Sequence, residues 1–163
     1  MSNGTKVPRG QAAAAGYKVM AAIGPYVRRA EICGSIRRGV ELVHDCDIVA
    51  VAYHDEAAAA AMEALAGMGE IIRAGKKLTS ARVEGVQVDL WLVPNESWGA
   101  ALMFATGSPH LNIRQRQMAR RRGMVLNRYG LYRDGDPVAG ETEQEVYEAL
   151  GMAYLEPAER SWD

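Results

Sequence analysis

Three aspartates stand where their carboxylates could share one chemical task. Asp45 and Asp47 are one residue apart in the segment DCDIVAVAY, whose Val and Ile content predicts a strand over 45–53. Residues i and i+2 of a strand point to the same face, so these two carboxylates are expected to lie together. Asp89 stands alone in the apolar segment VQVDLWLVP, where an unpaired acid would be costly. If the two strands are neighbours, all three carboxylates converge.

Converging carboxylates repel one another unless a cation lies between them. Divalent ions that prefer oxygen ligands, Mg²⁺ above all, satisfy such a cluster. Two ions held by carboxylates are the usual arrangement for in-line phosphoryl transfer. We therefore predict that Asp45, Asp47 and Asp89 are catalytic and metal-binding residues, with two Mg²⁺ ions as cofactors and Mn²⁺ as a substitute.

A Gly-Ser pair precedes the aspartates, with Asp45 following Ser35 by ten residues. Gly34 would let the backbone approach a phosphate, Ser35 would donate a hydroxyl and Arg38 would offer a planar fork of donors. The sequence has no G-x-x-x-x-G-K-[ST] motif, so this phosphate cradle is not a P-loop. Taken alone, Asp-x-Asp is more often a solvated strand edge and Gly-Ser a hairpin turn. Their conjunction with a third acid in an apolar strand favours the chemical interpretation.

The elements that must position these residues indicate an α+β fold. Apolar spacing and Gly or Pro stops predict helices and strands in a mixed order, with a seam near Pro94. A capping box, Thr142 and Glu145, predicts the start of the last helix. The predicted helices are 11–22, 55–66, 96–106, 109–122 and 142–150, and the predicted strands are 31–34, 45–53, 70–74, 78–84, 86–93, 124–127 and 130–133.

Composition and charge bound the class of protein. The 163 residues carry a net charge of −1 and are 48% hydrophobic, which suits a globular protein that is not strongly basic overall. The stretch 100–133 nevertheless holds seven arginines and no acid, whereas 134–163 holds nine acids and one arginine. Such a basic stretch is either a solvated face or a local phosphate-binding surface. No secretory signal or bilayer-length apolar run is present and two cysteines form no framework, so a cytoplasmic location, in a bacterium or a virus-infected host, is expected.

Longer motifs in this sequence resemble a known family. The segment GSIRRGVELVHDCD, residues 34–47, is similar to the nucleotidyltransferase signature, and most similar to that of family X DNA polymerases, the polymerase beta type. The segment ALMFATGSPHLNIRQRQMARRRGMVLNRYGLY, residues 101–132, resembles the opening of that family's thumb, and TEQEVYEALGMAYLEPAERSW, residues 142–162, resembles its C-terminal end. The resemblance implies a nucleotidyltransferase palm over 1–95, with a mixed sheet and flanking helices. A small, mostly helical thumb with a short β-hairpin would follow over 96–163, a minimal palm-plus-thumb form.

The resemblance also implies residue roles. Asp89 would take the proton of the primer 3′-hydroxyl, and the Gly107–Ser108 peptide bond would be cis. The implied nucleotide-binding residues are Gly34, Ser35, Arg38, His44, Arg9, Phe104, Ala105, Gly107 and Asn112. The resemblance implies that two DNA-binding residues, Ile113 and Arg116, face the template side. Independently of it, Arg114, Arg116, Arg120 and Arg121 recur along one predicted helix, a spacing that suits phosphates and predicts that they bind DNA.

Several positions depart from the family pattern. Ala105 replaces the second ring of an aromatic pair, which places discrimination against ribonucleotides in question. Trp91 and Arg128 stand where the family has an arginine and a glutamate that act in its open–closed switch. Gln87 replaces a basic residue beside the third aspartate, and His44 replaces a small residue at the phosphate cradle.

The function these features predict is template-directed DNA polymerisation: addition of dNMP to a primer 3′-OH in short gaps, during DNA repair or end joining. Gapped or primer–template DNA and dNTPs would be the partners, with no membrane association and a monomeric chain. Three alternatives stay open: a template-independent terminal transferase, a small-molecule nucleotidyltransferase and a catalytically silent nucleic-acid-binding module.

Overall fold

A computed structural model describes residues 4–161 of the chain; Trp162, the last residue of the C-terminal motif, lies outside them. The fold is α+β and divides into two compact units, Met1–Val93 and Pro94–Asp163. Pro94 follows Val93, the residue after the last strand of the first unit, and its missing N–H suits the end of a ladder.

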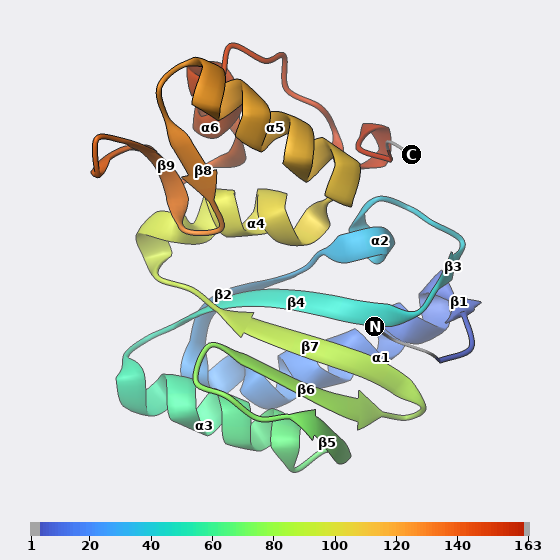
Figure 1. Ribbon diagram of the computed structural model, residues 1–163. Helices are drawn as coiled ribbons and strands as arrows, with labels where there is room; N and C mark the ends of the chain where they lie inside the picture. Colours follow the sequence, from blue (N-terminus) through green and yellow to red (C-terminus); the bar gives the residue numbers. More distant parts are fainter. Residues whose placement is uncertain (1–3, 162–163) are drawn as a thin grey trace. The chain divides into compact units, whose positions relative to one another are not determined.

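The N-terminal unit is built on a five-stranded mixed sheet in the order β2-β4-β7-β6-β5 (Figure 1). Its central pair, β4 and β7, is parallel, and the other neighbours are antiparallel. A separate two-stranded ladder joins β1 to β3. The strands are β1 (Val7–Pro8), β2 (Val27–Ile32), β3 (Leu42–Val43), β4 (Asp45–Ala52), β5 (Glu70–Arg73), β6 (Leu78–Val83) and β7 (Val86–Leu92), and the helices are α1 (Arg9–Ile23), η1 (Gly24–Tyr26), α2 (Gly34–Arg37) and α3 (Asp55–Ala66).

Helices α1 and α3 contact each other and pack on the same face of this sheet (Figure 1). The strands turn fully buried residues such as Cys46, Ile48 and Val88 toward them. Alanines on both helices permit a close approach, and Gly16 lies so near β4 that an added Cβ would overlap the Cys46 sulfur. Because strand residues alternate, the odd-numbered residues of β4 and β7 face the opposite side.

The C-terminal unit combines helices with a small antiparallel sheet in the order β10-β9-β8. Its core gathers Met103, Leu131, Val146, Tyr147 and Leu150. The elements are η2 (Asn95–Ser97), α4 (Trp98–Thr106), α5 (Pro109–Arg121), β8 (Val125–Asn127), β9 (Gly130–Arg133), β10 (Asp136–Ala139), α6 (Glu143–Ala149) and η3 (Pro157–Glu159).

Three sequence predictions need correction. The strand predicted over 31–34 is β2, which ends at Ile32, and Gly34 instead opens the short helix α2. The predicted hairpin of the C-terminal unit has a third strand, β10. This strand was not predicted because it begins with Asp136 and Pro137, which are typical of loops. The small β1–β3 ladder was also unforeseen. The capping box of α6 is confirmed, and no helix within residues 4–161 has the length and apolarity to cross a bilayer.

Candidate active site

The three aspartates come together on one face of the N-terminal sheet. Strands β4 and β7 pair in parallel with Asp47 beside Asp89 and Asp45 beside Gln87. Asp45 and Asp47 are two residues apart on one strand, so all three carboxylates point away from the face that α1 and α3 cover. Cys46, between them, points into the core and is a free, fully buried thiol.

The cluster strongly disfavours three negative charges. Burial, followed by repulsion from Asp45 and Asp89, raises the pKa of Asp47 well above its ordinary value, and Arg38 acts in the opposite direction. Burial and then Asp89 likewise raise the pKa of Asp45, against the influence of His44. The same desolvation and the neighbouring carboxylates raise the pKa of the Cys46 thiol to about 12. A divalent cation would remove this repulsion, because it favours the ionised form of every carboxylate around it.

Gly34 holds the phosphate-cradle segment against Asp47. Its φ of 62° lies in the left-handed region, and an added Cβ would overlap the Asp47 Oδ2 atom. The backbone N–H of Cys33 also donates to the Asp47 carbonyl at 2.7 Å. Ser35 and Arg38, both partly buried, follow in and directly after α2, so the three cradle residues of the sequence prediction stand next to the aspartates.

The other predicted nucleotide-binding residues of this unit lie on adjoining segments. The Arg9 side chain donates to the carbonyl of Gly39, just after α2, and its backbone N–H donates to Glu41 O at 2.8 Å. His44 precedes β4, is exposed, and has its Nδ1 atom 2.9 Å from Gly4 O. Arg9 is therefore hydrogen-bonded to the residues that follow the cradle, and His44 contacts the N-terminal segment.

Gln87 is a partner of the third aspartate whose role the sequence did not reveal. Its Nε2 atom donates to Asp89 Oδ1 at 3.0 Å from the same face of β7. Asp89 also shares a hydrogen bond with Asp47. Within residues 4–161 no group of three or more His, Cys, Asp or Glu has the arrangement of a preformed metal site. The donor set, carboxylate oxygens alone, fits a hard divalent ion, and metal binding stays a prediction.

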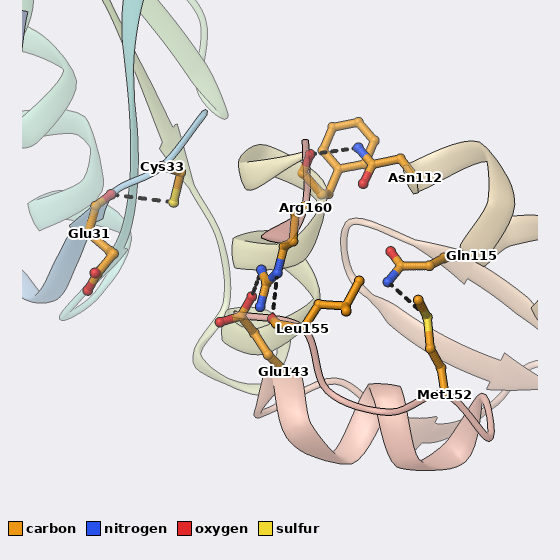
Figure 2. Close-up of polar contacts among 9 residues, drawn as sticks. Glu31, Cys33, Asn112, Gln115, Glu143, Met152, Leu155 and Arg160 are labelled. Atoms are coloured by element: carbon orange, nitrogen blue, oxygen red, sulfur yellow. Dashed lines mark hydrogen bonds and ion pairs between the residues drawn. The ribbon is translucent and has the colours of Figure 1, made fainter. Parts of the chain in front are cut away.

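In the C-terminal unit, three predicted contact residues line one pocket. Phe104, Asn112 and Arg116 share it with Ala100, Met103, Gln115, Leu126 and Asn127. Asn112 Nδ2 donates to the Phe104 carbonyl at 2.9 Å (Figure 2). Ala105, partly buried, follows on α4. The Gly107–Ser108 bond is cis, as the resemblance implied, and Ser108 caps α5 by accepting from the Leu111 N–H.

Helix α5 separates an apolar side from a basic side. Leu111, Gln115 and Ala119 are buried at a spacing of four residues, which defines the side that packs on the unit's core. The predicted DNA-binding residues lie outside that buried row: Ile113, Arg114, Arg120 and Arg121 are exposed and Arg116 is partly buried.

A buried ion pair that the sequence analysis did not identify anchors the end of this unit. Arg160 is 1% exposed and donates to Glu143 Oε2 at 2.5 Å and to Leu155 O at 3.0 Å (Figure 2). The rings of Tyr147 and Tyr154 lie 5.4 and 5.3 Å from its guanidinium carbon. Its backbone carbonyl accepts from the Ser108 N–H at 3.0 Å, so the C-terminal segment supports the turn that opens α5.

Comparison with known proteins agrees with this architecture. Residues 101–161 match the family model described as DNA polymerase beta thumb. The chain is 36% identical over 88 residues to DNA polymerase lambda of Rattus norvegicus, covering 47% of this chain and 15% of that protein. It is 29% identical over 129 residues to the DNA polymerase/3′-5′ exonuclease PolX of Bacillus subtilis (strain 168), covering 76% and 23%. It is 33% identical over 81 residues to the DNA nucleotidylexotransferase of Eulemur macaco, covering 48% and 16%.

These matches define the class of proteins that the chain is similar to, two DNA polymerases and a DNA nucleotidylexotransferase, and residues 101–161 resemble the thumb of DNA polymerase beta. The matched regions span less than a quarter of the length of each of these relatives.

Proposed function

We propose that this chain is a template-directed DNA polymerase that adds dNMP to a primer 3′-OH and fills short gaps in DNA repair or end joining. Its substrates would be gapped or primer–template DNA and dNTPs. The observation that carries this proposal is the gathering of Asp45, Asp47 and Asp89 on one sheet face, with Gly34 against Asp47. Residues 1–95 would act as the nucleotidyltransferase palm and 96–163 as the thumb. Its monomeric state and cytoplasmic location stay predictions.

The reaction joins two substrates by in-line displacement. The primer 3′-oxygen bonds to the α-phosphorus while the bond from that phosphorus to the bridging oxygen breaks, and pyrophosphate leaves with the electron pair. Asp89 would accept the proton of the 3′-hydroxyl or pass it to water. Two Mg²⁺ ions, held by the three aspartates, would lower the pKa of that hydroxyl and neutralise the triphosphate.

The protein groups bind and orient the triphosphate. Ser35 and Arg38 would donate to its β and γ phosphates, joined by the backbone N–H at His44, with Arg9 nearby. The close approach that Gly34 permits would bring these donors to the same point as the carboxylates. Positioning of this kind supplies much of the rate in phosphoryl transfer, since the protein contributes little covalent chemistry.

The C-terminal unit would select the nascent base pair. Phe104, Ala105 and Gly107 would contact the sugar and Asn112 the minor-groove edge of the incoming base, while Arg116 would face the template side. The shared pocket of Phe104, Asn112 and Arg116 supports this assignment. Ile113 would offer an apolar contact that suits every base, and the exposed arginines of α5 would bind phosphates.

A second candidate is template-independent addition, because one of the matched relatives is a DNA nucleotidylexotransferase. A single assay separates the two. Offered a one-nucleotide gapped duplex, Mg²⁺ and each dNTP alone, the polymerase adds only the complementary nucleotide, and Asp89→Ala abolishes addition. Addition of every dNTP regardless of template supports the transferase, and no addition to any DNA end refutes both. Repeating the assay with rNTPs tests Ala105: a strong preference for dNTPs would show that the missing ring is not needed for discrimination.

A further inference from the structure

We propose that Arg82 and Arg73 form a phosphate-binding track for the primer strand on the aspartate face of the N-terminal sheet. This inference rests on the proposed polymerase function and adds a DNA-binding surface to it. The track involves neither the helix α5 arginines nor the phosphate cradle, so it can be tested separately from them.

The strand register places both arginines on the correct face. In the β6–β7 ladder Ser80 lies beside Asp89 and Arg82 beside Gln87. Since paired residues of neighbouring strands share a face, Ser80 and Arg82 lie on the face that carries Asp89. Neighbouring strands are about 4.8 Å apart and alternate residues about 6.7 Å apart, so the Arg82 backbone lies roughly 8 Å from that of Asp89.

A β-bulge brings Arg73 to the same face. In the β5–β6 ladder Ile71 pairs with Ala81, and the next pair is Arg73 with Ser80, which leaves Ile72 as the extra residue. Without this shift Arg73 would pair with Thr79 and face the helices. Re-aiming a side chain is a known consequence of a bulge. Arg73 therefore extends the row from Asp89 through Ser80 to the edge of the sheet, two strands or roughly 10 Å away.

In-line geometry assigns this row to the primer rather than to the triphosphate. The cradle around Gly34 lies against Asp47 on β4, so the leaving pyrophosphate would lie on that side of the cluster. The attacking and leaving oxygens must lie on opposite sides of the α-phosphorus. The 3′-oxygen then approaches from the β7 side, and the strand behind it crosses β6 and β5.

The charge of this surface suits a phosphate backbone. Arg82 and Arg73 are exposed, and the ion pairs within residues 4–161 involve other residues. Glu70, the register partner of Arg82 on β5, is the acid beside the row, on the far side of Arg82 from Asp89. The occupant we assign is therefore the primer's backbone; an unprimed single strand or a purely solvated edge are outcomes of the test.

The test measures DNA affinity and its salt dependence for Arg82→Gln and Arg73→Gln. Lys18→Gln is the matched control: it removes the same charge from α1, on the helix-covered side, where Lys18 pairs with Glu84. Each track variant should weaken binding of primer–template DNA about three- to tenfold and reduce the salt slope by about 1, as loss of one phosphate contact does. The control should leave both unchanged.

The identity of the strand is tested with single methylphosphonate substitutions, which remove one phosphate charge. A neutral linkage among the first few primer phosphates should weaken wild-type binding and have no further effect in Arg82→Gln. Unchanged affinity in both track variants, or equal loss for unprimed single strands, overturns the proposal. If the wild-type chain adds no nucleotide while the primer-specific losses persist, the polymerase proposal fails and the track stands.

Discussion

Gly34→Ala should distinguish an effect on the rate of nucleotide addition from an effect on folding stability better than any substitution of an aspartate. The added Cβ has two effects: it occupies a left-handed backbone, at φ 62°, and it overlaps Asp47 Oδ2. The backbone effect costs about 1–2 kcal/mol. Moving the Asp47 side chain off its rotamer adds about 0.5–1.5 kcal/mol. We expect a total loss of about 1.5–3.5 kcal/mol in the free energy of unfolding.

Gly85→Ala is the matched control. Gly85 has φ 81° in the β6–β7 hairpin, and an added Cβ there meets nothing within 4 Å. It therefore carries the backbone penalty of about 1–2 kcal/mol without the collision. For a chain of this size each kcal/mol lowers the melting temperature by about 2–4 °C, so the two variants should melt a few degrees apart.

The larger difference should lie in the rate of nucleotide addition. Displacing a reacting or ligating group by about 1 Å costs on the order of 100-fold in rate. Single-turnover addition on gapped DNA, at saturating Mg²⁺ and dNTP, should therefore fall about 100-fold in Gly34→Ala and stay near wild type in Gly85→Ala. Equal rates for the two variants would refute the claim that Gly34 is required for its approach to Asp47.

Three further outcomes are expected. Gln87→Leu should raise the Mg²⁺ concentration for half-maximal nucleotide addition about three- to tenfold, because the lost hydrogen bond to Asp89 is worth about 1 kcal/mol. An Mg²⁺ titration of nucleotide addition checks this, and Gln87→Arg, which keeps a hydrogen-bond donor at this position, should restore the wild-type value. An unchanged half-maximal Mg²⁺ concentration in Gln87→Leu would contradict the prediction. Hydrogen bonds from the backbone, that of Gly140 first, lower the pKa of Glu145 below its ordinary value of 4.5, so its stabilisation is present above pH 4.5 and is lost as pH falls below it. The free energy of unfolding of Glu145→Gln, measured by urea denaturation across this pH range, should depend less on pH than that of wild type. If the two pH profiles are parallel, the Glu145 carboxylate does not cause the pH dependence. Arg160→Met leaves Glu143 buried without its cation and should cost about 3–5 kcal/mol of unfolding free energy, measured by urea denaturation against wild type.

Local spacing accounts for what the sequence could predict about the N-terminal unit. Asp45 and Asp47 share a face because any strand has a period of two. The helix over 55–66 coincides with α3 because acids open it and glycine follows its end. Gly85 separates the strands predicted over 78–84 and 86–93, and in the β6–β7 hairpin both loop residues, Glu84 and Gly85, have positive φ. Asp134–Gly135 is a turn of the same kind, in which two positive-φ residues join β9 to β10. The strand β10 was not predicted because this pair was not interpreted as a hairpin turn.

The features that escaped prediction depend on register, which a single sequence does not encode locally. The segment VQVDLWLVP does not indicate which strand lies beside it. The prediction that Asp89 lies next to Asp47 therefore depended on the assumption that their strands are neighbours. The bulge at Ile72 changes the face of Arg73 without any glycine to announce it. Burial of Arg160 required a partner 17 residues earlier in the chain, and a charged residue near a C-terminus is ordinarily expected at the surface. The roles of side chains that depend on a neighbour across the sheet, such as Arg73 and Arg82, are therefore tested by substituting those side chains and not by searching the sequence for motifs.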